Sequence, residues 1–209
     1  MIPLRDKIPV RRSKPTRNPK KDWKVHKPDL KEDFYSHCAY CFSYDGYRHT
    51  YFEADHFIPQ VFFLPLGNIK VTDYYNLVYS CKFCNYNKRA KWPSKSETVY
   101  NDGKRGFIDP CTDEIETHLY RTSDGGIMWK TELGKWLFSK AFNFDQRQDS
   151  IKVLWNLNRL KKVILDLDET SALFSKDSND YKEIRAKIGE YAIEYFWMHD
   201  ALIEFYNNC

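Results

Sequence analysis

The sequence lacks any apolar run long enough to cross a membrane, and its N-terminus is charged and proline-bearing where a signal peptide would be apolar. Of its six cysteines, four fall into two closely spaced pairs, whereas Cys111 and Cys209 belong to no motif. Free thiols are typical of a reducing compartment, where disulfides are rare. These absences argue against a membrane or secreted protein, and we expect a cytoplasmic one.

The chain also has little net charge, +4 over 209 residues, but this charge is unevenly distributed. The first 28 residues contain ten Lys or Arg against two Asp, together with five prolines. Because proline interrupts helices, we expect residues 1–30 to form an extended basic arm. The arm either follows a phosphate backbone or is a solvated, partly disordered tail. The candidate nucleic-acid contacts in it are Arg11, Arg12, Lys20 and Lys21.

The two cysteine pairs are the most specific feature of the sequence. Cys38 and Cys41 form one CxxC pair, and Cys81 and Cys84 form the other. Four thiolates can hold zinc tetrahedrally, and such a site joins distant segments of chain without a hydrophobic core of its own. The sequence therefore predicts a structural zinc site made of these four cysteines.

Three further residues with metal-binding or basic side chains accompany the pairs. Asp55 and His56 lie between them, and Asn85 directly follows the last cysteine. Carboxylate and amide oxygens are ligands for Mg²⁺ or Mn²⁺, and a histidine titrates near neutral pH. This pattern predicts a second, catalytic metal site with Asp55 and Asn85 as ligands and His56 as its base. The alternative is a purely structural zinc ribbon, in which His56 and Asp55 are ordinary surface residues.

Residues 38–88 resemble the HNH endonucleases of the ββα-metal class. The similarity combines both CxxC pairs with the Asp55-His56 pair, an Asn76-Leu77 dipeptide and a Cys-Asn-x-x-Lys ending at Lys88. It implies a zinc-braced hairpin and helix that carry one catalytic metal and cut nucleic acid to leave a 5′ phosphate. The name-giving positions are then His56, Asn76 and Asn85, the last in the place often held by a second histidine. Asn76 is implied to hold the backbone of His56 by a hydrogen bond across the loop.

Phosphodiester hydrolysis suggests a role for each residue of this set. His56 accepts the proton of the attacking water, with a backbone carbonyl of the facing strand fixing its tautomer. Lys88 lies one helical turn after Asn85 and can contact a phosphate. Neighbouring strand residues point to opposite faces, so Asp55 and His56 reach one metal only if the strand bulges or ends there.

Several polar neighbours compete with the chosen residues. Glu53 shares a strand face with Asp55, and we interpret it as an outer or solvated carboxylate. Asn87 competes with Asn85, but only Asn85 adjoins a zinc cysteine. His37 and His49 flank the first pair, where four thiolates already complete the zinc shell.

The sequence indicates an α+β protein. We expect three parts: the arm (1–30), the zinc-braced core (31–110), and a small β element with a helical region (111–209). The core should contain strands near Arg48–Phe57 and Asn76–Tyr79 and a helix from Asn85. Helices are expected over 151–167, where leucines recur on one face, and towards the C-terminus.

The last expected helix carries an apolar seam with alternating spacings of four and three. The seam consists of Ile184, Ile188, Tyr191, Tyr195, Met198, Leu202 and Phe205. It packs within the chain, against a second copy in a homodimer, or on a protein partner such as a sensor or ATPase subunit.

Residues 107–127 show a weaker similarity to bacterial phage-defence proteins. We therefore expect a metal-dependent endonuclease acting on DNA, in an anti-phage or restriction system; the alternative is a non-catalytic zinc-braced nucleic-acid-binding module.

Overall fold

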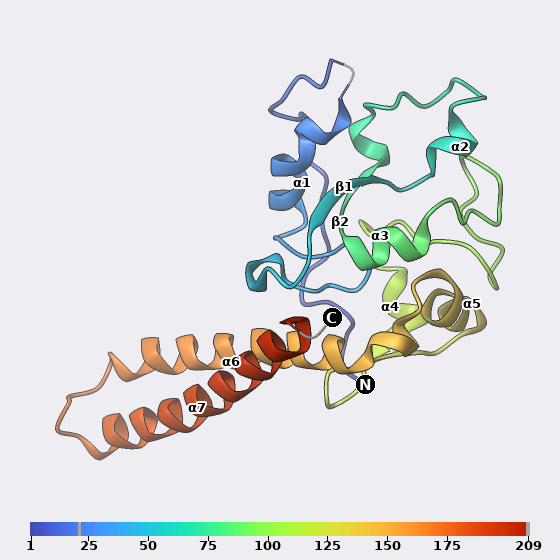
Figure 1. The fold of residues 1–209 in the computed structure, drawn as a ribbon. Coiled ribbons are helices and arrows are strands. Elements are labelled where there is room, and N and C mark those ends of the chain that lie inside the picture. Colours follow the sequence, from blue (N-terminus) through green and yellow to red (C-terminus); the bar gives the residue numbers. More distant parts are fainter. Residues whose placement is uncertain (21, 208–209) are drawn as a thin grey trace. The chain divides into compact units, whose positions relative to one another are not determined.

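The structure is a computed structural model that describes the backbone of residues 1–20 and 22–207 and the side chains of 1–20 and 22–204. The chain is α+β and divides into two units, Met1–Gln148 and Asp149–Cys209 (Figure 1). Both sheets belong to the first unit. This division differs from the expected boundaries near residues 30 and 110, because the N-terminal arm and the small β element belong to the same unit as the cysteine pairs.

The first sheet is a hairpin followed directly by a helix. Strand β1 (Phe52–His56) pairs antiparallel with β2 (Leu77–Cys81) in regular register, and α3 (Lys82–Lys88) begins at the next residue. All of β2 is buried, whereas burial alternates along β1. Because side chains alternate along a strand, Glu53 and Asp55 share the more exposed face. The order is the expected strand, loop, strand and helix.

The connection between the two strands is long but structured. It contains the short helix α2 (Gln60–Phe63) and the 3-10 turn η3 (Tyr74–Asn76), which leads into β2. Another 3-10 turn, η2 (Asp45–Tyr47), precedes β1. The aromatic ring of Phe63 is fully buried, which fixes α2 on the first unit.

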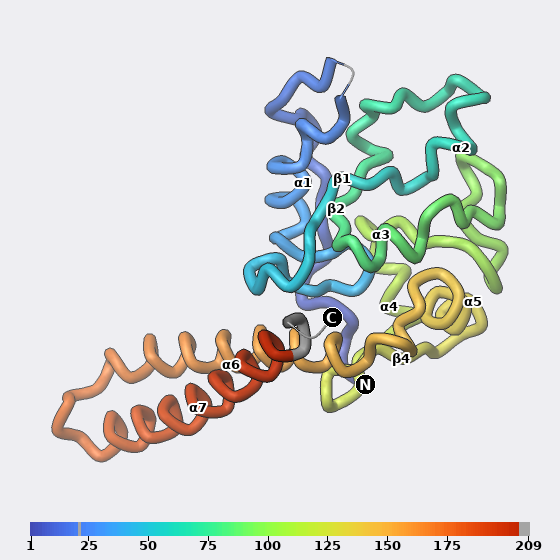
Figure 2. Tube along the Cα trace, in the orientation of Figure 1, coloured from blue at the N-terminus to red at the C-terminus, as the bar shows by residue number. Residues whose placement is uncertain are grey.

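The N-terminal arm is packed along the first unit. Its described residues form no helix before η1 (Trp23–His26), which continues into α1 (Lys27–Asp33) with a proline in its first turn (Figure 2). Ile2 forms a β-bridge with Arg121, and Leu4 is buried. The guanidinium of Arg5 is buried and donates to backbone carbonyls of residues 110 and 112. We call residues 1–20 the N-terminal strap.

Two arginines predicted to contact nucleic acid have protein partners instead. Arg11 forms an ion pair with Asp109 and donates to the carbonyl of Leu77. The guanidinium of Arg12 binds three carboxylates of α1, those of Asp29, Glu32 and Asp33. These acidic partners neutralise the arginines, and nucleic-acid contact by Arg11 and Arg12 stays a prediction. Lys20 is exposed, and Lys21 lies outside the described residues.

The rest of the first unit follows α3. Helix α4 (Ile115–His118) leads into the hairpin of β3 (Leu119–Arg121) and β4 (Ile127–Trp129), and α5 (Glu132–Trp136) continues as a π-helical turn (Leu137–Ala141). A last 3-10 turn spans Phe144–Arg147. The core here is aromatic, with the Phe107 ring stacked on Trp92 and against Phe142.

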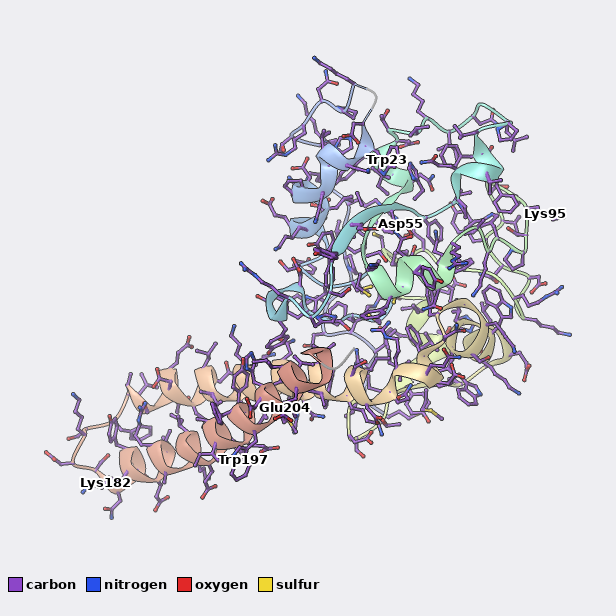
Figure 3. All side chains as sticks on the ribbon, viewed as in Figure 1. Trp23, Asp55, Lys95, Lys182, Trp197 and Glu204 are labelled. Carbon is purple, nitrogen blue, oxygen red and sulfur yellow. The ribbon has the colours of Figure 1, made fainter. Side chains whose placement is uncertain are left out.

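The second unit is a hairpin of two long helices, α6 (Gln148–Ser171) and α7 (Asn179–Asn207). Arg185 of α7 pairs with Asp168 of α6. Along the apolar seam Leu202 is buried, the preceding members are partly buried, and the Phe205 side chain lies outside the described part. Figure 3 shows Trp197 on α7, where its side chain is exposed. Use of the seam by a second chain stays a prediction. No helix in the described part of the chain is both long and apolar enough to cross a membrane.

Candidate metal centre and adjoining pocket

The four cysteines converge on one buried point. Cys38 and Cys41 follow α1, Cys81 ends β2 and Cys84 lies on α3. Their sulfurs all lie within 4.8 Å of one another, and the Sγ atoms of Cys41 and Cys81 are 3.8 Å apart. Zinc–sulfur bonds of about 2.3 Å in a tetrahedron place sulfurs about 3.8 Å apart, so the cluster fits a zinc ion. Among the described residues, no other group of three His, Cys, Asp or Glu is arranged in this way.

The histidines considered as substitute zinc ligands lie outside the cluster. The Nδ1 atom of His37 is 2.6 Å from the carbonyl oxygen of Tyr35, and its ring stacks on Phe42. His49 is buried, and this burial lowers its pKa to about 4. The cluster is therefore composed of cysteines alone.

Two arginines, the half-buried Arg147 and the buried Arg121, lie beside the cysteine cluster. Arg147 places a guanidinium nitrogen 4.0 Å from the Sγ of Cys84 and stacks on the ring of Phe83. Arg121 donates to the carbonyl of Cys41. Zinc with four thiolates carries a net charge of about −2, and two cations beside it offset the cost of burying that charge.

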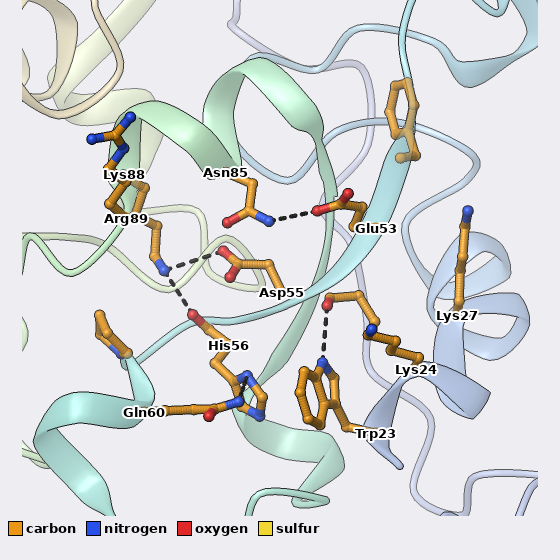
Figure 4. A pocket seen from close by; sticks show the side chains of 13 residues that line it. Trp23, Lys24, Lys27, Glu53, Asp55, His56, Gln60, Asn85, Lys88 and Arg89 are labelled. Atoms are coloured by element: carbon orange, nitrogen blue, oxygen red, sulfur yellow. Dashed lines mark hydrogen bonds and ion pairs between the residues drawn. The ribbon is translucent and has the colours of Figure 1, made fainter.

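A pocket of about 500 Å³ adjoins the cluster (Figure 4). Strand β1 and helix α3 contribute most of its lining, and η1, α1 and α2 contribute the rest. It brings together four of the predicted site residues, Asp55, His56, Asn85 and Lys88. The labelled polar and aromatic residues around it are Trp23, Lys24, Lys27, Glu53, Asp55, His56, Gln60, Asn85, Lys88 and Arg89.

Asp55 is held by one of its two oxygens. Its Oδ2 accepts hydrogen bonds from the Lys88 ammonium at 3.1 Å and from the Tyr40 hydroxyl at 3.4 Å. Burial raises the pKa of Tyr40, which therefore remains a donor. Because Tyr40 lies between Cys38 and Cys41, the cysteine cluster fixes one partner of Asp55. Within the described residues Oδ1 accepts no hydrogen bond, so it is available as a ligand atom.

Lys88 differs from the expected phosphate contact. Its side chain is 1% exposed, and its ammonium donates to the carbonyl oxygen of His56 at 2.7 Å as well as to Asp55. The lysine therefore joins α3 to the end of β1. The structure supports a positioning role for Lys88, and direct contact with a phosphate stays a prediction.

This buried ion pair makes Lys88 a sensitive position. We expect Lys88→Met to leave the Asp55 carboxylate without its charged partner and to lower the free energy of unfolding by about 3 kcal/mol. Urea unfolding followed by tryptophan fluorescence measures the change. Lys82→Met, on the exposed face of the same helix, should cost well under about 1 kcal/mol. Equal losses for the two variants would contradict the assigned role.

Glu53 orients Asn85. The amide nitrogen of Asn85 donates to the Glu53 carboxylate at 2.8 Å. This bond leaves the amide oxygen of Asn85 on the side of Asp55 (Figure 4). Asp55 and Asn85 therefore offer one carboxylate oxygen and one amide oxygen to the same side of the pocket, a donor set suited to Mg²⁺ or Mn²⁺. Asn87 instead bonds Phe83 and Asn143.

His56 is the last residue of β1, and its register with β2 is regular. Its side chain points to the opposite side of the strand from Asp55 (Figure 4). The Nε2 atom lies 2.8 Å from the carbonyl oxygen of Val71, to which it donates, so Nδ1 carries the lone pair. Val71 belongs to the loop before η3, not to the facing strand as expected.

The surroundings of His56 favour its neutral form. Burial lowers the pKa of His56, and the Lys88 charge lowers it further, whereas the Val71 carbonyl and Asp55 oppose both. The Gln60 amide nitrogen lies 3.2 Å from Nδ1, and the Trp23 ring packs at 4.9 Å. In this tautomer the Gln60 amide donates to the lone pair of Nδ1, so a pocket water must replace that bond before Nδ1 can accept its proton.

Asn76 bridges the loop as expected, but it binds residues that follow His56 in the chain. Its side-chain oxygen accepts from the Ile58 amide at 2.8 Å, and its side-chain nitrogen donates to the Ile58 carbonyl. The backbone carbonyl of Asn76 accepts from Phe57. The clamp therefore holds the two residues that follow His56 instead of His56 itself.

One wall of the pocket comes from a segment that sequence reasoning assigned only to the basic arm. Trp23 and Lys24 lie on η1 and Lys27 begins α1. The Trp23 indole donates to the carbonyl of Ala54 at 3.3 Å and lies near Asp55 (Figure 3). A lone tryptophan among lysines was the only signal in the sequence.

Comparisons of the chain with protein-family models, curated proteins and solved structures found no match.

Proposed function

We propose that this chain is a metal-dependent HNH endonuclease that hydrolyses phosphodiester bonds in DNA. The observation that carries the proposal is the arrangement of one pocket: two oxygen ligands, on Asp55 and Asn85, lie on one side of β1, and a neutral histidine lies on the other. Nucleic-acid binding alone requires neither the two oxygen ligands nor the neutral histidine.

The arrangement suits in-line hydrolysis of a phosphodiester. Attack by water opposite the leaving oxygen needs a base on one side of the phosphorus and positive charge on the other. His56 is the base: its Nδ1 takes the proton of the attacking water, while the Val71 carbonyl holds the Nε2 proton in place. The Gln60 amide, which donates to the same nitrogen in the structure, would have to give way to that water.

The opposite side supplies charge through the residues that hold a metal. Asp55 Oδ1 and the Asn85 amide oxygen would hold Mg²⁺ or Mn²⁺, which when bound stabilises negative charge on the phosphate and on the leaving oxygen. Lys88 holds Asp55 in place by a hydrogen bond, and Glu53 holds Asn85 in the same way. The cysteine cluster, with zinc, keeps α3 and the Tyr40 loop together and has no role in the bond cleavage itself.

The direct test is cleavage by the purified, zinc-loaded protein. We expect Mg²⁺ or Mn²⁺ to support cutting of supercoiled plasmid, and EDTA in brief excess to stop it while the slowly exchanging zinc remains. Single-stranded DNA and RNA in parallel reactions identify the preferred substrate. Cutting that persists without divalent ions would contradict the metal site, and DNA binding without any cutting would favour a binding module. Action in an anti-phage or restriction system stays a prediction.

A further inference from the structure

We propose that the DNA backbone is gripped by a cationic rim of the pocket, formed by Lys24, Lys27 and Arg89, and not by the arginines of the N-terminal strap. The inference takes its ligand from the proposed function. It adds a phosphate-binding surface made of two segments that lie 60 residues apart in the sequence.

The rim residues lie on two walls of the pocket. Lys24 and Lys27 stand on the wall made by η1 and α1, and Arg89, directly after α3, stands on the wall made by that helix (Figure 4). All three side chains are exposed. The metal ligands and His56 lie between the walls, so a strand seated on the rim would pass over them.

The rim cations are free to bind phosphate, in contrast to those of the strap. Within the described residues, none of the three forms an ion pair. Arg5 pairs with Glu116, Arg11 with Asp109, and Arg12 with the acidic face of α1. A cation already paired with a carboxylate offers little attraction to a polyanion, so the unpaired ones determine binding.

Aromatic rings hold two of the rim cations near the pocket. The Lys24 ammonium lies 5.6 Å from the Trp23 ring centroid, and the Arg89 guanidinium lies 3.8 Å from that of Tyr86. Trp23 is itself fastened to β1 through its indole nitrogen. Restrained cations lose less conformational freedom when they bind a phosphate.

The base of the pocket carries excess negative charge, so attraction for DNA must come from the rim. It carries the carboxylates of Glu53 and Asp55 against a single buried ammonium, that of Lys88. This excess of negative charge repels a phosphate backbone until a divalent cation binds. Attraction must therefore come from the three rim cations, together with the metal ion.

The test measures DNA binding separately from cutting. The zinc-loaded His56→Ala protein, in Mg²⁺, is titrated into a short fluorescent DNA duplex and followed by anisotropy. We expect the triple change Lys24→Gln, Lys27→Gln and Arg89→Gln to weaken binding at least tenfold and to lower the salt dependence of log K by about 2 to 3, as loss of three phosphate contacts requires. The matched control changes three exposed lysines of the second unit, Lys176, Lys182 and Lys187, to Gln.

The control loses the same charge and should bind within about twofold of its parent, because none of its lysines lines the pocket. Unchanged melting temperatures show that both triple variants are folded. Equal affinity of the rim variant and its parent, or an equal loss in the control, would overturn the inference. Tighter rim-dependent binding of a matched RNA would overturn its assignment to DNA. If the wild type cleaves no substrate but DNA binding still depends on the rim, the nuclease proposal is contradicted and the rim is supported as a DNA-binding surface.

Discussion

His56→Ala is expected to reduce metal-dependent DNA cleavage by about 10²- to 10⁴-fold, the usual contribution of a positioned general base. The change removes the imidazole that lines the pocket on this side of β1, and alanine cannot accept the proton of the water. Initial rates of plasmid nicking, measured at equal zinc content, give the ratio.

The substitution should leave the rest of the site intact. The clamp around Asn76 is made by the residues after His56, and Lys88 binds the backbone carbonyl of position 56, which alanine keeps. Melting temperature and zinc content are therefore expected to stay close to those of the parent. His199→Ala, in the second unit, serves as the matched control and should cut at the parental rate. A fall in melting temperature that matches the loss of cleavage would mean that His56 is only a packing residue.

Cys81→Ser is expected to abolish zinc retention and to unfold much of the first unit. Serine replaces a thiolate at the end of the fully buried β2, and a three-thiolate site holds zinc far more weakly. At structural zinc sites the free energy of metal binding contributes directly to the free energy of folding, by about 10 kcal/mol or more in zinc-finger peptides. Zinc content measured by a colorimetric chelator, together with circular dichroism, gives both readouts.

The control for this change is Cys111→Ser. Cys111 lies outside the cluster and is partly buried, and burial raises its pKa to about 11, so it is a neutral thiol that serine replaces closely. We expect normal zinc content and a melting temperature within a few degrees of the parent. If Cys81→Ser keeps its zinc and its fold, the four cysteines do not form the brace.

The local elements and the cysteine cluster could be predicted from the sequence because their signals are short-range. Two-residue spacing places both thiols of each pair on one turn, and Asn85 adjoins Cys84. The aromatic residues and Thr50 predict strand β1, and Pro93 predicts the end of a helix from Asn85, whereas α3 begins at Lys82 and ends at Lys88. In these cases neighbouring residues carry the relevant information.

The contacts that decide the charges of the site could not be predicted, because their partners are far apart in sequence. Arg11 is neutralised by Asp109, and Lys88 is buried against Asp55. Nothing near either cation in the sequence distinguishes it from a solvent-exposed one. The same holds for Trp23, whose position against His56 depends on where η1 packs. Charge counts along the sequence therefore predicted a basic arm, whereas the ion pairs decide which cations remain free.

The N-terminal strap also bears on the order in which the chain can fold during synthesis. Ile2 bridges to Arg121, and the Leu4 amide donates to Glu116, so both residues are made more than a hundred residues before their partners. The four cysteines, by contrast, are all present once residue 84 has left the ribosome. Zinc can therefore assemble the hairpin and helix early, while Ile2 and Leu4 still lack their partners. A nascent chain would thus carry a formed metal brace before Ile2 and Leu4 of the strap are fixed in place.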